Sequence, residues 1–172
     1  LDQFFGENPE KGTLPEELVL SHPFIKTFKK TESRPLASCE IILHHDSIRS
    51  GKRFLDFTLS PQRSIIMVNL LAKNDLHIAE MTVNGSPVEA SDYEETDFDK
   101  KKDETILQYI FSHAEKDVRI SLLMVNKPLT FYLKELSYDL LSNDLFQILP
   151  RPDFMMPQIV SDAIETIRTV EL

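Results

Sequence analysis

The chain has 172 residues, 41% of them hydrophobic, with only 4 Gly, a single Cys and no Trp. This length supports one domain with its own core and is too short for two domains of ordinary size. The net charge of -9 repels a phosphate backbone and so argues against nucleic-acid binding as a main task. One cysteine excludes both an internal disulfide and a zinc site built from cysteines.

The first 35 residues show no regular hydrophobic pattern. The stretch "GENPEKGTLPEE" has the Gly and Pro residues of a loop, and the short basic stretch "FKKTESR" is interpreted as a solvated linker. The chain starts without Met and without a signal-peptide pattern, so we interpret it as a piece of a longer protein. We therefore expect an irregular lead-in over residues 1–35 and a folded domain over residues 36–172.

From residue 36 onward the hydrophobic residues alternate with a period of two, which is typical of β-strands. In "ASCEIILHH", Cys39, Ile41 and Leu43 fall on one face, and in "RFLDFTLS" Leu55 and Phe57 do the same. The continuous apolar run "SIIMVNLLA", residues 64–72, predicts a strand covered on both faces. It is too short to cross a membrane as a helix.

The next stretch, "DLHIAEMTVNGSPVEA", places Asn84 and Gly85 between two β-prone runs and predicts a tight hairpin. Four more strands are predicted in "ETILQYIFS", "DVRISLLMV", "LTFYLKELSYDL" and "AIETIRTVEL". About eight short strands without a convincing amphipathic helix predict an all-β fold. The expected architecture is an antiparallel β-sandwich, jelly-roll-like, over residues 36–172.

The stretch "ILHHDSIRSG" raises the question of a metal site. Neighbouring side chains of a regular strand point to opposite faces, so His44 and His45 cannot both reach one ion unless the strand bulges. His44 and Asp46 are expected to share a face. A catalytic zinc site needs three protein ligands and an open position, so a third ligand such as His113 would have to converge on them.

A longer match to di-zinc aminopeptidases can also be traced. Those enzymes use a His-x-Asp, a second Asp, a Glu-Glu pair and a distant His, and here the order is followed by His44, Asp46, Asp56, Glu94, Glu95 and His113. In that family the second Asp bridges two metals from an Asp-Asp-Gly turn of an α/β sheet, whereas Asp56 lies in the strand-like "FLDFTL". We therefore interpret the order as a coincidence and the two histidines as part of a strand edge.

The remaining motifs give no site either. The acidic stretch of residues 91–104 has carboxylates that suit calcium, but it lacks the EF-hand spacing and glycine, and we interpret it as a solvated hairpin tip. Cys39 lies on an apolar strand face, where thiols are usually inert, and neither a nucleophile elbow nor a phosphate loop occurs. No residue is assigned to catalysis, cofactor binding or metal binding.

The final quarter of the chain carries a family resemblance. "LKELSYDLLSNDLFQILPRPDFMMPQIVSDAIETIRTVEL" resembles the closing segment of membrane-anchored zinc aminopeptidases, the group of the endoplasmic reticulum metallopeptidase and the vacuolar membrane protease with their bacterial members. The matching positions are Ser137, Tyr138, Leu140, Arg151, Pro152, Met156, Pro157 and residues 164–172. Asp139 and Leu141 depart from it, because the family has Gly and Pro there.

Earlier segments extend the resemblance over most of the chain. "LDFTLSPQRSIIMVNLLAKNDLHIAEMTVNG" is similar to the family's strand, Arg-containing turn, strand and Val-Asn-Gly hairpin. "DQFFGENPEKG" is similar to the segment that follows the membrane spans. The resemblance covers turn and strand residues only, and it supplies no site residue that could be carried over to this chain.

The resemblance implies a non-catalytic, extracytoplasmic accessory domain, tethered to the membrane through upstream spans. Zinc would belong to an upstream peptidase domain that this chain does not contain, so no cofactor is expected here. The implied partners are that peptidase domain, the spans, and a peptide or protein. Two alternatives stay open: an independent carbohydrate- or protein-binding β-sandwich, which a groove with exposed aromatic residues would favour, and a small metal-dependent hydrolase.

Overall fold

The computed structural model describes residues 10–11, 27–28, 34–72, 77–88, 105–112, 117–146 and 162–172. The chain divides into two compact units, residues 1–36 with 139–163, and residues 37–138 with 164–172. In the first unit, β1 (Glu10–Lys11) and β2 (Thr27–Phe28) pair antiparallel. The second unit holds the two large sheets, so residues 139–163, which we had expected within the sandwich domain, are grouped with the lead-in.

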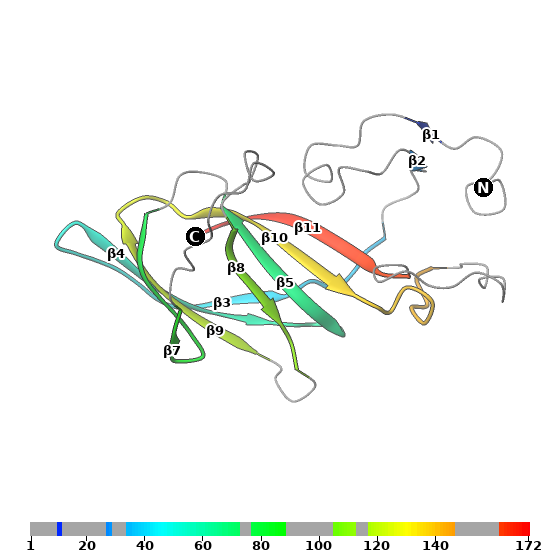
Figure 1. Cartoon of the computed structure of the whole chain (residues 1–172), viewed down its shortest axis with the longest axis horizontal. Helices are drawn as coiled ribbons and strands as arrows, with labels where there is room; N and C mark the ends of the chain where they lie inside the picture. Colours follow the sequence, from blue (N-terminus) through cyan, green and yellow to red (C-terminus); the bar gives the residue numbers. More distant parts are fainter. Residues whose placement is uncertain are drawn as a thin grey trace, which may run out of the picture. The chain divides into compact units, whose positions relative to one another are not determined.

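The second unit is a sandwich of two antiparallel sheets (Figure 1). The five-stranded sheet has the order β3-β4-β9-β6-β7, and its strands are β3 (Glu40–Arg49), β4 (Lys52–Ser60), β9 (Val118–Val125), β6 (Ile78–Val83) and β7 (Ser86–Pro87). The four-stranded sheet has the order β11-β10-β5-β8, with β11 (Ile164–Glu171), β10 (Thr130–Ser137), β5 (Ile65–Ala72) and β8 (Thr105–Ile110). Consecutive strands repeatedly change sheet, for example from β4 to β5 and from β5 to β6.

This architecture confirms the predicted all-β antiparallel sandwich, with nine strands in the two sheets where about eight were expected. No helix occurs among the described residues. It follows that the part of the chain described here contains no helix long and apolar enough to cross a membrane.

Two tight hairpins join neighbouring strands of the five-stranded sheet. Asn84 and Gly85 connect β6 to β7 with φ of 51° and 79°, and Ser50 and Gly51 connect β3 to β4 with φ of 50° and 75°. Positive φ at both central residues gives a turn whose twist matches that of the flanking strands. The hairpin predicted at Asn84 is therefore confirmed, and the one at Ser50 has the same geometry without the usual Asn.

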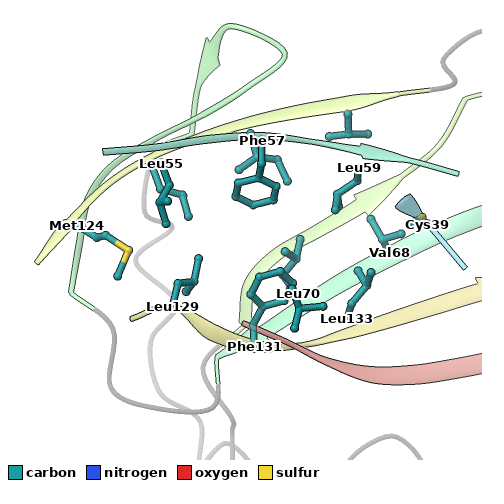
Figure 2. Close-up of a cluster of buried hydrophobic side chains, with 14 of the residues drawn as sticks. Cys39, Leu55, Phe57, Leu59, Val68, Leu70, Met124, Leu129, Phe131 and Leu133 are labelled. Carbon is teal, nitrogen blue, oxygen red and sulfur yellow. The ribbon is translucent and has the colours of Figure 1, made fainter. Parts of the chain in front are cut away.

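The core lies between the two sheets (Figure 2). Leu55, Phe57 and Leu59 of β4 point toward the other sheet and are 0% exposed. Phe131 and Leu133 of β10 meet them from the opposite side, and the rings of Phe57 and Phe131 stack with centroids 6.4 Å apart. These inward positions follow the period-two pattern read from the sequence, which is why the strands hold this register.

Strand β3 contains a bulge at its centre. Leu43 pairs with Phe57 and His45 pairs with Asp56, so His44 is an extra residue with no partner of its own on β4. An extra residue shifts the alternation of side-chain direction by one position in the rest of the strand. The bulge decides which of the polar residues in "ILHHDSIRSG" lie together.

Candidate functional site

Two of the polar residues singled out in the sequence, His44 and Asp56, lie on the outer face of the five-stranded sheet. Thr58 lies between the core residues Phe57 and Leu59, so its side chain points away from the core, and it is nevertheless only 8% exposed. His44 lies over it, with Nε2 2.8 Å from Thr58 Oγ1. The bulge places His44 on this outer face together with Asp56, the next outward residue of β4.

Asp56 is the centre of this outer cluster and is 7% exposed. Arg119 of β9 donates two hydrogen bonds to it, from Nε to Oδ1 at 3.0 Å and from Nη2 to Oδ2 at 2.6 Å. Ser121 donates a third, from Oγ to Oδ1 at 3.3 Å. A bidentate guanidinium–carboxylate pair of this kind satisfies most of the acceptor sites of the carboxylate.

The surroundings of Asp56 favour its ionised form. The hydrogen bonds from Arg119 hold the pKa of the Asp56 carboxyl below its ordinary value, against the opposing effect of burial. Arg119 is fixed in turn by the hairpin, because its backbone N–H donates to Asn84 Oδ1 at 2.9 Å and its carbonyl accepts from the Asn84 N–H at 2.8 Å. The cluster therefore joins β3, β4, β9 and the turn after β6.

Within the described part of the chain, the outer cluster does not show the arrangement that nucleophilic catalysis requires. His44 and Thr58 lie at the distance of a base and a hydroxyl nucleophile, but a catalytic histidine is oriented by a third group on its other ring nitrogen. Among the described residues no carboxylate forms that bond to His44. Ser121 donates to Asp56, which cannot activate it because an ionised carboxylate held by an arginine is a weak base.

A second ion pair lies on the other side of the same sheet. Asp46 pairs with the core residue Leu55 in register, which places it on the inward side at the end of the sandwich. Arg53 donates to it from Nε at 2.8 Å and from Nη2 at 2.6 Å, and its Nη1 donates to the carbonyls of Lys127 and Leu172. These hydrogen bonds fasten the end of the β3–β4 hairpin to the loop before β10 and to the end of β11.

The expectation that His44 and Asp46 share a face is therefore wrong. The bulge puts His44 on the outer face and Asp46 on the inward side, where each already has a hydrogen-bonded partner. Within the described ranges no group of three or more His, Cys, Asp or Glu side chains is placed to hold a metal ion. Glu94, Glu95 and His113 of the traced order lie outside the described residues, as does the acidic stretch 91–104.

A buried polar cluster, which the sequence analysis missed, surrounds Glu135 of β10. Glu135 is 0% exposed and points into the sandwich in phase with Phe131 and Leu133. It accepts hydrogen bonds from Ser38 Oγ at 2.5 Å, from the Cys39 N–H at 2.8 Å and from Thr166 Oγ1 at 3.0 Å. These contacts attach the segment before β3 to both β10 and β11.

Arg63 supplies the opposite charge for Glu135. Its Nη2 lies 3.8 Å from Glu135 Oε2, its Nε donates to the Ala37 carbonyl at 3.0 Å, and its Nη1 donates to Ser137 Oγ. Arg63 belongs to the turn between β4 and β5. The sequence held one signal of this cluster, since Glu135 occupies a position of its strand where the alternation calls for an inward apolar residue. A glutamate at such a position must find hydrogen-bond donors and a cation inside the fold.

Cys39 lies beside this buried cluster and is 2% exposed. Its carbonyl accepts a hydrogen bond from Arg168 of β11. Burial, and after it the nearby Glu135 carboxylate, raise the pKa of the Cys39 thiol to about 12. A thiol that stays protonated at neutral pH is a poor nucleophile and metal ligand, so the geometry agrees with its interpretation as a packing residue.

The middle of the outer face of the four-stranded sheet is shielded from solvent. Lys134 and Asn69 pair across β10 and β5 on the side away from the core. Asn69 is 8% exposed, and the Lys134 and Glu165 side chains, joined by a 2.9 Å ion pair, are each 13% exposed. These central side chains therefore present little free surface, whereas Ile110 of the edge strand β8 is 69% exposed.

Fold and contacts together define the second unit as an antiparallel β-sandwich whose buried charges serve as structural ion pairs. Searches against protein-family models, curated proteins and solved structures find no match to this chain.

Proposed function

We propose that this chain is a non-catalytic accessory domain of a membrane-anchored zinc aminopeptidase, working on the extracytoplasmic side. Its role is to position the peptidase domain, the substrate or a partner. The zinc and the residues that bind it belong to the peptidase domain. The His, Asp, Glu and Cys side chains described in this chain do not fit a zinc site, since none of them form a group able to hold an ion.

The observation that carries the proposal is the set of contacts made by the residues on which the family resemblance rests. The Arg of the Arg-containing turn, Arg63, is the cation beside the buried Glu135, and Ser137 at the end of β10 accepts a hydrogen bond from it. The Val-Asn-Gly hairpin is the turn whose Asn84 holds Arg119. Residues that build one sandwich through long-range contacts support membership of a family defined by such a domain.

The hydrolase alternative loses support because its described ligands have other roles. Asp56 is held by Arg119, Asp46 by Arg53, and His44 contacts Thr58 on a different face from Asp46. The glycan-binding alternative needs neighbouring exposed aromatic residues. Among the described residues, the large exposed aromatic side chains are Phe54 and Tyr138. Phe54 lies in β4 of the five-stranded sheet, and Tyr138 directly follows β10 of the four-stranded sheet.

The test on the purified chain measures zinc by mass spectrometry together with turnover of a panel of aminoacyl chromogenic substrates. We expect neither stoichiometric zinc nor turnover, and the same result for His44→Ala and Asp56→Asn. A second test of the same proposal is the sequence of the full gene, which should encode membrane spans and a zinc peptidase domain upstream of this chain. Stoichiometric zinc with turnover that is lost in His44→Ala would overturn the proposal, and so would an upstream sequence without a peptidase domain.

A further inference from the structure

The edge strand β3 is the most exposed of the long strands of the sandwich. It is ten residues long, and among the described residues its one neighbouring strand is β4. Ile42, Leu43 and Ile48 of this strand are 40%, 47% and 59% exposed. A long edge strand with exposed apolar side chains leaves backbone donors and acceptors free to pair with another strand.

The bulge determines which side chains of β3 share a face. On the inward side lie Ile41 and Ile48, because they pair in register with Leu59 and Arg53 of β4. On the outer side lie Glu40 and Arg49, which pair with Ser60 and Lys52. In a strand without a bulge, residues 41 and 48 would lie on opposite faces, and so would residues 40 and 49.

We propose that β3 pairs antiparallel with β3 of a second copy of this chain and so joins the two five-stranded sheets into one. The pairing sets Glu40 of one copy opposite Arg49 of the other, and Ile41 opposite Ile48. A two-fold axis makes each of these contacts twice, as expected of a symmetric dimer. Residues opposite each other in antiparallel strands must share a face, and the bulge between the two halves of β3 is what satisfies this condition.

Charge favours a second copy over a non-specific contact. The chain carries a net charge of -9, so two copies repel each other unless the contact surface is locally balanced. In β3 the exposed Glu40 meets Arg49 of the partner copy in the proposed register, and the charge of Asp46 is already compensated by Arg53 within the same copy.

The test is the molecular mass of the purified full chain in solution as a function of concentration, by sedimentation equilibrium. We expect a reversible monomer–dimer equilibrium. Glu40→Arg or Arg49→Glu alone should weaken it by about tenfold or more, because each places like charges opposite each other twice. Mixing the two single variants should restore a dimer, since every pair between the two then joins unlike charges.

Control variants separate β3 from other edges. Ile48→Lys should abolish the dimer, whereas Ile110→Lys on the edge strand β8 and Glu171→Arg on the edge strand β11 should leave it unchanged. Circular dichroism melting checks that each variant is folded. A wild-type chain that stays monomeric at every soluble concentration overturns the proposal, and so does a dimer that the β3 variants leave intact. The first result would rule out self-pairing of β3 and would leave the proposed accessory function untouched.

Discussion

Arg119 of β9 holds Asp56 of β4 through two hydrogen bonds, from Nε to Oδ1 at 3.0 Å and from Nη2 to Oδ2 at 2.6 Å. The carboxylate is 7% exposed although it lies on the outer face of its sheet. The pair links the middle of β4 to the strand beside it, and Asn84 fixes Arg119 from the hairpin. An aspartate that resembled a metal ligand in the sequence is thus part of the scaffold.

The Asp56–Arg119 pair should make the stability of the domain depend on acid pH. The pKa of Asp56 is held below its ordinary value of 3.8, chiefly by the Arg119 hydrogen bonds. A depressed pKa in the folded state adds stability above the unfolded value, and this stability is lost as the pH falls through the folded value. As the pH falls from about 5 to about 2, the unfolding free energy of Asp56→Asn should therefore decrease less than that of the wild type.

The measurement for Asp56 is urea unfolding at a series of pH values. Glu80→Gln, which removes an exposed carboxylate from the same sheet, is the control for the loss of one charge. The stability curves of wild type and Asp56→Asn should converge at the acid end. Curves that stay parallel over the whole range would show that the pair does not couple protonation to folding.

Removing the buried carboxylate of Glu135 should be strongly destabilising. Glu135→Leu leaves the Arg63 guanidinium, the Cys39 N–H and two hydroxyls without their acceptor, and breaking a buried pair from one side costs about 3–5 kcal/mol. Glu135→Gln keeps the size and part of the hydrogen bonding, so its loss should be smaller. The exposed Glu171→Gln is the matched control and should change the unfolding free energy by less than about 0.5 kcal/mol.

Urea unfolding at neutral pH measures these differences. If Glu135→Leu were as stable as wild type, the buried cluster would not be a net source of stability, because its desolvation cost would equal the interactions that it makes.

The Cys39 thiol should be unreactive in the folded protein. Burial and the Glu135 carboxylate raise its pKa to about 12, so at about pH 8 almost no thiolate is present to attack a disulfide reagent. Labelling with an aromatic disulfide should be slow in buffer and immediate in denaturant. The double variant Cys39→Ala/Ser112→Cys, with the thiol at an exposed position, should react at once in both. Fast labelling of native wild type would place Cys39 in a solvent-accessible environment.

Two substitutions test the positive φ that the β6–β7 turn requires. Gly85 has φ of 79° and no atom within 4 Å of the position of an added Cβ, so Gly85→Ala should cost about 1 kcal/mol through backbone strain alone. Asn84→Gly keeps the conformation and removes the hydrogen bond to the Arg119 N–H, so its loss should be smaller. Thermal unfolding measures both, with the exposed Ser86→Ala as the control. Equal melting temperatures for Gly85→Ala and wild type would contradict this account of the turn.

The strands and one hairpin could be predicted because their signals are local. The alternation of Leu55, Phe57 and Leu59 specifies an inward face wherever the strand pairs, and Asn84 with Gly85 accepts positive φ at low cost. The β3–β4 turn was harder to predict from the sequence, because Ser50 has a positive φ and serine is not a residue type that favours it.

The bulge and the buried ion pair could not be predicted in the same way. A bulge at His44 depends on how β3 meets β4, and the residues alone show an unbroken run that suggests regular alternation. Glu135 and Arg63 belong to different turns and strands, and only the packing of two sheets brings them to 3.8 Å. A prediction that relied on alternation therefore put His44 and Asp46 on one face.

The most direct test of the proposed function uses the full-length protein, which the proposal expects to be a zinc aminopeptidase. The ratio of kcat/KM for long peptides to kcat/KM for a small aminoacyl chromogenic substrate should be measured with residues 37–172 present and deleted, and with Glu135→Leu as a variant that disrupts only this domain. An accessory domain that positions substrate should change this ratio, by about tenfold if one good contact is lost, while the parent keeps its zinc. An unchanged kcat/KM on peptides of every length would contradict the proposal.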